Sequence, residues 1–324
     1  MKKVNSYIIL MLALLMLLTV CSCSMKGEKQ ELQRFDIEKL PPSGSEANLS
    51  KVSLAPGFDA STIQTSAMVY KTSPVEISRE EIITLAELLG ISEINIVEND
   101  ISTSISDGTG NMVIVFNASG SIGCCLSEER NAASIAKEAE MLSNDEYISI
   151  ARAWLNAAGM LSDEYLEKEI QITDNDFLIT IDEKGEEVSI PVLKTVVFMY
   201  RDLDGIEING VAPRIIVDLS IDGKVVSVDK IQREFTPFDR YPLISIEEAI
   251  DKIENNDCVI YSSGILDDSG IIESCKLFYY NREVADDYEY LIPVFAFYGT
   301  SGEEQFTAVV IAVDDNYCTI TDPQ

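Results

Sequence analysis

The sequence predicts an α+β fold, in which antiparallel sheets are each packed by one or two helices. Three segments carry the Ser-x-x-Glu pattern of a helix N-terminus ahead of an amphipathic stretch. Runs of alternating or β-branched apolar residues, typical of strands, separate these helices, with short turns such as Asp-Gly between them. Because several strands follow one another between helices, the pattern favours α+β over α/β.

Composition limits the classes of function. The chain has 324 residues, of which 46% are hydrophobic, so it can form a packed core and about two domains. It carries 24 basic and 55 acidic residues, and the resulting charge of −31 would repel a phosphate backbone, which excludes nucleic acid as a partner. It contains no histidine, which excludes Ser-His and Cys-His couples and imidazole metal sites.

Residues 1–22 have the pattern of a secretory signal peptide. Two lysines precede the apolar run Tyr7–Val20, whose fourteen residues are fewer than the roughly twenty that a transmembrane helix needs. The sequence Val20-Cys21-Ser22-Cys23 resembles the lipobox of bacterial lipoproteins. The resemblance implies that Cys23 is lipidated, with Cys21 as the competing acceptor, and that the chain faces the extracytoplasmic side of the cell membrane. Two acyl chains suffice for stable anchoring.

The rest of the chain divides into three expected segments. Residues 23–65 contain prolines, serines and mixed charge without a sustained apolar period, which predicts a flexible tether. Residues 66–142 are expected to form a small α+β domain. Residues 143–324 are expected to form a larger domain with an antiparallel sheet.

The small domain is expected to contain two helices. The Ser78/Glu81 capping box starts the first helix, Gly90 ends it, and a second, alanine-rich helical stretch covers about 128–142. Its strands are expected at Ala67–Lys71, Asn111–Phe116 and Ser121–Leu126.

Two further capping boxes start the helices of the larger domain. They begin at Ser143 and Ser245 and predict helices at 144–158 and 246–254, with Trp154 on the apolar face of the first. The strands are expected at Lys194–Tyr200, Arg214–Ser220, Lys224–Ile231, Cys275–Tyr280, Tyr290–Tyr298 and Gln305–Val313.

Several of these stretches resemble known bacterial modules. Tyr70–Gly90, a Val-Tyr strand leading into a capped helix that ends in Leu-Gly, looks like the first unit of a family of secreted proteins. The stretch from Tyr200 through Asp222-Gly223-Lys224-Val225 to Tyr241-Pro-Leu-Ile-Ser-Ile-Glu-Glu-Ala249 is similar to YycH/YycI-type regulators of envelope histidine kinases and to PepSY or propeptide-like modules. Tyr290–Phe297 resembles the strand that closes such domains. The resemblance implies a non-enzymatic fold that contacts other envelope proteins.

Cysteines and acidic clusters are the candidates for chemistry. Five cysteines follow the anchor, and Cys258 and Cys275 are interpreted either as a disulfide or as small core residues. The Asp-rich stretches, among them Asp174-Asn-Asp176 and Asp202-Leu-Asp204-Gly205, are interpreted as turns or solvated surface because their spacing does not fit a calcium loop. No metal site, cofactor or catalytic residue is predicted.

Aromatic residues on the C-terminal strands are the candidate binding surface. Tyr279, Tyr280, Phe297 and Tyr298 alternate across strands, so one face is expected in the core and the other at an interface. We therefore expect a non-enzymatic surface lipoprotein that modulates or scaffolds an envelope partner, such as a sensor kinase, by protein contact. The alternatives are a solute-, peptide- or cation-binding lipoprotein and a hydrolase that uses carboxylates alone.

Overall fold

The computed structural model describes residues 31–41, 48–91, 95–126, 140–166, 170–181, 187–200 and 202–321. The predicted signal peptide, Cys23 and residues 128–139 of the expected second helix lie outside this part of the chain. Residues 140–142 are described and are not helical. In the described part of the chain, no helix combines the length and the apolar character needed to cross a membrane.

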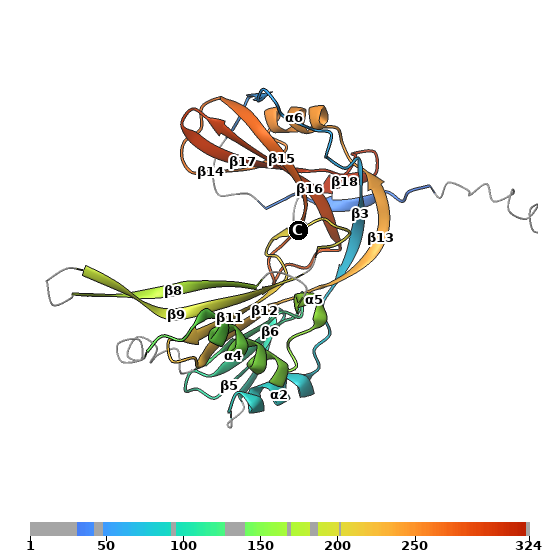
Figure 1. Cartoon of the computed structure of the whole chain (residues 1–324). Helices are drawn as coiled ribbons and strands as arrows, with labels where there is room; N and C mark the ends of the chain where they lie inside the picture. The colour runs from blue at the N-terminus through green and yellow to red at the C-terminus, as the bar shows by residue number, and fades with distance from the viewer. Residues whose placement is uncertain are drawn as a thin grey trace, which may run out of the picture.

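The chain folds into two lobes (Figure 1). The middle lobe holds the described residues between 75 and 200 and those from 214 to 232. The terminal lobe holds the described residues from 31 to 73, from 202 to 212 and from 234 to 321, so both ends of the described chain lie in it. The architecture is α+β, as predicted, and strands predominate over helices.

An eight-stranded antiparallel sheet forms the middle lobe. Its order is β4 (Asn95–Glu98), β5 (Ser102–Ser106), β6 (Met112–Phe116), β7 (Ile122–Cys125), β12 (Val225–Ile231), β11 (Arg214–Ser220), β9 (Glu187–Met199) and β8 (Ile170–Ile181). In β11 the alternation of the sequence places Ile215, Val217 and Leu219 in the core with no exposed area.

Helices cover one face of this sheet. They are α2 (Arg79–Leu88), α4 (Asn144–Ala157) and α5 (Asp163–Leu166). The capping boxes predicted at Ser78 and Ser143 are both present, and Gly90 and Gly159 follow the C-caps with φ of 77° and 66°, a conformation that glycine adopts without strain. The apolar faces of α2 and α4 share one core with the sheet, and Trp154 packs against that core half-buried.

The boundary expected at residue 142 does not separate two sheets. Strands β4–β7 precede it and β8, β9, β11 and β12 follow it, yet β7 and β12 pair directly, with Cys124 opposite Val228. Both of these side chains are buried in the common core. The pairing joins segments about a hundred residues apart, and no local sequence pattern encodes which distant strand completes an edge.

The terminal lobe is built on a second sheet. The strand order is β10 (Ile208–Gly210), β15 (Ser269–Asn281), β16 (Tyr290–Ser301), β17 (Glu304–Ile311) and β14 (Val259–Ser262). The helix α6 (Ile246–Glu254) begins at the predicted capping box of Ser245 and Glu248, and its apolar side packs on this sheet. The strands β3 (Ser66–Ser73) and β13 (Glu234–Pro242) extend the sheet from β16 and run side by side toward the middle lobe (Figure 1).

Part of the segment predicted as a flexible tether is folded. The strand β1 (Phe35–Glu38) pairs in parallel with β18 (Cys318–Thr321), and β2 (Lys51–Leu54) pairs in parallel with β15. The side chain of Phe35 is 5% exposed, and that of Leu49 is fully buried. The prediction of a tether was wrong for these residues because each strand has only four residues and depends on partners far along the chain.

Candidate functional site

The four aromatic residues predicted as a binding surface do not share one surface. Tyr279 and Phe297 are fully buried, Tyr280 is half-buried, and Tyr298 is 37% exposed. Phe297 packs in the core beneath α6, whereas the Tyr279 hydroxyl donates to the carbonyl of Met68 at 2.8 Å. The prediction was wrong for Tyr279 and Phe297 because both faces of the sheet are covered at these positions, which a strand pattern alone does not reveal.

Tyr298 lies at a shallow pocket of the terminal lobe. The pocket has a volume of about 390 Å³, and Tyr261, which is 41% exposed, lies on the same sheet face. Both tyrosines flank Thr307 in the strand register, so the two rings border one stretch of polar side chains. Of the four predicted residues, only Tyr298 is therefore exposed enough to contact a partner.

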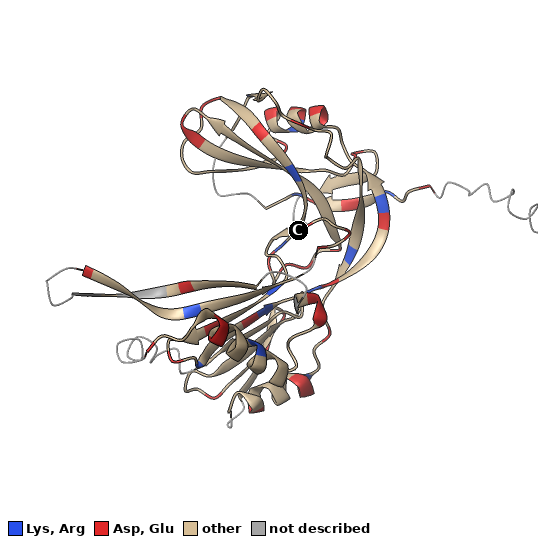
Figure 2. Cartoon of the chain, in the orientation of Figure 1, with Lys and Arg blue, Asp and Glu red and all other residues tan. Residues whose placement is uncertain are grey.

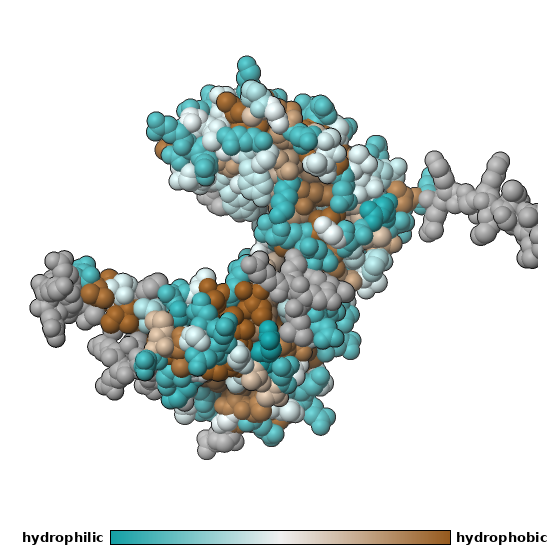
Figure 3. All heavy atoms as spheres, viewed as in Figure 1, coloured by the Kyte–Doolittle hydropathy of each residue, from teal (hydrophilic) through white to brown (hydrophobic). Residues whose placement is uncertain are grey.

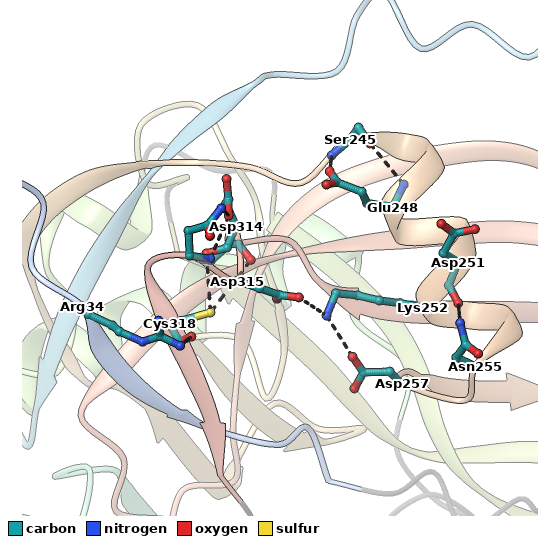
Figure 4. Close-up of polar contacts among 12 residues, drawn as sticks. Arg34, Ser245, Glu248, Asp251, Lys252, Asn255, Asp257, Asp314, Asp315 and Cys318 are labelled. Carbon is teal, nitrogen blue, oxygen red and sulfur yellow. Dashed lines mark hydrogen bonds and ion pairs between the residues drawn. The ribbon is translucent and has the colours of Figure 1, made fainter.

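An acidic pocket surrounds Lys252 near the end of α6 (Figure 4). Its volume is about 390 Å³, and its walls carry Glu248, Asp251, Asp257, Asp314 and Asp315. The Lys252 ammonium group is 2.9 Å from Asp257 Oδ2 and 3.0 Å from Asp315 Oδ2, and its side chain is only 13% exposed. The lysine thus joins the helix to two loops.

The charges of this pocket are engaged in structural contacts. Burial lowers the pKa of Lys252, but the hydrogen bonds to the two aspartates outweigh it and raise the pKa above its usual value. Lys252 therefore stays cationic and does not serve as a base at neutral pH. Hydrogen bonds from the Ser245 backbone N–H and hydroxyl lower the pKa of Glu248. Among the described residues, no group of three or more Asp, Glu, Cys or His side chains is placed to hold a metal ion.

The Asp202–Gly205 segment forms a turn, as interpreted from its sequence. Leu203 and Ile206 bridge to each other, and Asp204 has a positive φ of 53°. Its carboxylate accepts a hydrogen bond from the Arg240 guanidinium. This contact neutralises the carboxylate within the protein.

A third pocket, of about 440 Å³, lies beside Arg282. The side chain of Arg282 is 11% exposed and donates to the Glu38 carboxylate at 2.8 Å and to the carbonyls of Glu38 and Lys39 at 2.9 and 2.7 Å. These three contacts hold β1 and the residue after it against the terminal lobe. The arginine therefore fixes a strand of the fold and has few donors left for an anion.

None of the five described cysteines is in a disulfide. The disulfide considered between Cys258 and Cys275 is not formed, and both residues pack against the core beneath α6, as in the alternative interpretation. Burial raises the pKa of Cys275 to about 12 and, together with the charge of Asp257, that of Cys258 to about 11. Both thiols are protonated at neutral pH and are poor nucleophiles.

The hairpin of β8 and β9 extends beyond the rest of its sheet. β9 pairs with β11 only from Leu193 to Met199, whereas its pairing with β8 continues as far as Glu187 opposite Ile181. This end projects from the middle lobe (Figure 1), and its described apolar side chains Ile179 and Val188 are 68% and 38% exposed. The space-filling view shows an open recess between the hairpin and the terminal lobe (Figure 3).

β8 is not among the strands predicted from the sequence. Its signal is the alternation of Ile170 with Ile172 and of Ile179 with Ile181, interrupted by Asp174-Asn-Asp176. That acidic triplet was interpreted as a turn or solvated surface. It lies within the strand because pairing with β9 continues through the interruption, and the Asp174 side chain is 43% exposed.

Comparisons with known proteins describe the fold only. No family model matches the chain, and no curated protein matches it. The chain is similar to a solved structure of an uncharacterized protein from Eubacterium rectale, with 10% identity and a TM-score of 0.41, over 84% of this chain and 91% of that one. A likeness at this level carries no argument about function.

Proposed function

We propose that the protein is a lipid-anchored, extracytoplasmic protein without catalytic activity that acts by contact with an envelope protein such as a sensor kinase. The anchor is proposed at Cys23, on the lipobox-like sequence that follows the apolar run of residues 7–20. Residues 24–30, and at most a few residues beyond them, would serve as the tether, since β1 begins at Phe35.

The observation that carries this proposal is the projecting hairpin of β8 and β9. An isolated two-stranded hairpin is marginally stable in water, and exposed apolar side chains on such an element are typical of contact surfaces. Ile179, with 68% of its surface exposed, belongs to this class of residue. The polar pockets support the proposal indirectly. Lys252 and Arg282 form ion pairs with carboxylates of the same chain, so these cations are not set aside for a ligand.

The alternative, a solute-, peptide- or cation-binding lipoprotein, has weaker support. The three pockets described above have volumes of about 390 to 440 Å³, near the low end of the roughly 300–1,000 Å³ typical of small-molecule sites. A ligand that binds one of them would raise the melting temperature saturably. Thermal shift measurements with calcium, amino acids and short peptides therefore test this alternative.

Cross-linking in the native host tests the proposed function. The lipidated protein is expected to fractionate with membranes and to yield one reproducible cross-linked envelope protein. The variant Cys23→Ser is expected to leave the membrane fraction and lose that product, whereas Cys21→Ser serves as the matched control and keeps both. Recovery of the same proteins as an unrelated lipoprotein of similar abundance would reject contact with a specific partner.

A further inference from the structure

The edge strand β8 is long and regular, and its only charged residues are Asp174 and Asp176. Natural proteins shorten such strands or place proline, lysine or a bulge in them, since an open edge pairs readily with other chains. β8 has twelve residues, contains neither proline nor lysine, and pairs with β9 without a shift in register.

The other sheet edges in the described part of the chain have such protection. β1, β2, β4, β14 and β18 have four residues each, and β10 has three. The part of β9 beyond its pairing with β11 contains Pro191. β13 has nine residues, but Pro237 lies within it, and its register shifts between Pro237 and Asp239. The length and regular pairing of β8 therefore contrast with the other described sheet edges.

The far half of the hairpin would gain most from an added strand. There, β8 and β9 pair only with each other, because the pairing of β9 with β11 stops at Leu193. A third strand would convert this two-stranded ribbon into a three-stranded sheet, the smallest that is independently stable, and would cover part of the exposed Ile179 side chain. Asn175 already interacts with another group, so the parts of β8 that can pair with an added strand lie before and after this residue.

The charge of the hairpin selects the kind of strand. The hairpin sequence 170–199 contains six acidic residues and two lysines, of which Lys194 forms an ion pair with Asp174, in a chain of net charge −31. Acidic residues mark the described far end of the hairpin and are spread over both lobes (Figure 2). Pairing of β8 with β8 of a second copy would bring these like charges together, which is unfavourable, whereas a basic strand would be attracted.

The location of β8 also suits an added strand. β8 is the strand of its sheet that borders the open space toward the terminal lobe (Figure 1), and that space is a recess in the space-filling view (Figure 3). An extended segment on the β8 edge would lie in this recess. Tyr298 and Tyr261 of the terminal lobe are exposed on the sheet face opposite the core beneath α6, where they are available for further contact.

We propose that the outer edge of β8 binds an extended, basic segment of the envelope partner by adding it to the sheet as a ninth strand. This inference rests on the proposed function and names the site and the chemistry of the contact. Main-chain hydrogen bonds to the edge would supply affinity for any extended segment, and the acidic hairpin would select lysine and arginine side chains.

Site-specific photo-cross-linking of the full lipidated chain in native membranes tests the inference. A photoreactive phenylalanine analogue replaces Thr173 on β8 or, as the matched control, the exposed Val97 on the opposite edge strand β4. The expected product forms at Thr173 and not at Val97, and mass spectrometry places it in a partner segment rich in lysine and arginine. Reversal of three charges in the sequence stretch 182–187, with Glu183, Glu186 and Glu187 each changed to lysine, is expected to lower the yield about ten-fold or more.

A variant with the same change in charge elsewhere controls for the net charge of the chain. Glu76, Glu87 and Asp100 are exposed in the middle lobe away from β8, and their replacement by lysine should leave the yield at Thr173 unchanged. Thermal unfolding of each variant checks that it is folded. The inference is overturned if the Thr173 product is a second copy of this chain, a lipid, another segment of the same chain or an acidic segment, or if hairpin charge reversal has no effect.

The two proposals fail in different ways. If general cross-linking recovers a partner but Thr173 yields no product, contact occurs elsewhere and only the strand-addition inference is rejected. If neither experiment recovers a specific partner, the proposed function is rejected and the inference with it.

Discussion

Replacing Phe35 by alanine tests whether the N-terminal segment belongs to the terminal lobe. The Phe35 side chain is 5% exposed, and its ring centroid lies 4.8 Å from those of Tyr241 and Tyr290 and 6.0 Å from that of Phe238. Removing a buried phenylalanine side chain costs about 3–5 kcal/mol.

Detachment of β1 sets an upper limit to this loss. β1 pairs only with β18, so the variant can release β1 while the rest of the lobe stays folded. Burial of Phe35 and Ile37, the two buried side chains of β1, contributes about 1.5–3 kcal/mol each, or about 3–6 kcal/mol together, and the hydrogen bonds from Arg282 add to the docking of β1. We therefore expect Phe35→Ala to lower the free energy of unfolding of the terminal lobe by about 3 kcal/mol.

Urea unfolding followed by two spectroscopic signals measures this loss. Near-UV circular dichroism of tyrosine reports on both lobes, because Tyr241 and Tyr290 contact Phe35 and Tyr147 and Tyr165 are buried in the middle lobe. A transition seen by this signal and not by tryptophan fluorescence belongs to the terminal lobe. Fluorescence of Trp154, the single tryptophan, reports on the middle lobe. Asp36→Ala, an exposed position on the same strand, is the matched control and should change stability by less than about 0.5 kcal/mol. Equal stability of the two variants would refute the reasoning and restore a tether that extends through residue 65.

Four further predictions concern α6 and the core beneath it. Ser245→Ala should destabilise the terminal lobe by about 1 kcal/mol in urea unfolding, since it removes a helix cap. The pKa of Glu248 is lowered in the folded state, so the stabilisation by its carboxylate is complete above its unfolded pKa and is lost as the pH falls through its folded pKa. The difference in unfolding free energy between wild type and Glu248→Gln should therefore shrink below about pH 4. A difference that stays constant with pH would contradict this. Lys252→Met should cost about 1–2 kcal/mol, less than a fully buried pair, because its two carboxylate partners are 47% and 61% exposed. Since the pKa of Lys252 is raised in the folded state, the stabilisation by its ammonium group is complete below its unfolded pKa of about 10.4 and is lost as the pH rises through its folded pKa. Urea unfolding at pH 8 and at pH 11 would detect this loss. Cys258 and Cys275 should react with a thiol reagent slowly at pH 8 and rapidly in urea; a gain in mass on reduction would instead reveal a disulfide.

Local sequence signals predicted the elements whose stabilising contacts are close in the chain. The three capping boxes at Ser78, Ser143 and Ser245 are present because each depends on a glutamate three residues away. Strands β11, β12, β16 and β17 lie close to their predicted ranges because alternation and the Asp222-Gly223 turn are local features.

Predictions failed where the outcome depends on distant partners. The N-terminal strands β1 and β2 are short, and only their pairing with β18 and β15 makes them regular structure. Tyr279 and Phe297 were expected near an interface, but segments from other parts of the chain cover both faces of their sheet. The boundary at residue 142 failed for the same reason, since β7 finds its partner in β12.

The sequence alone therefore determined the α+β class, the helix starts and most strands, because caps, turns and side-chain alternation act over a few residues. It also supports the expectations of an anchor at Cys23 and of a protein that contacts an envelope partner, which stay predictions. Only the tertiary structure decided that each lobe combines segments from distant parts of the sequence and that β8 is a long edge strand of its sheet. Strand order and burial are set by which surfaces meet after folding, and a linear pattern does not carry that information.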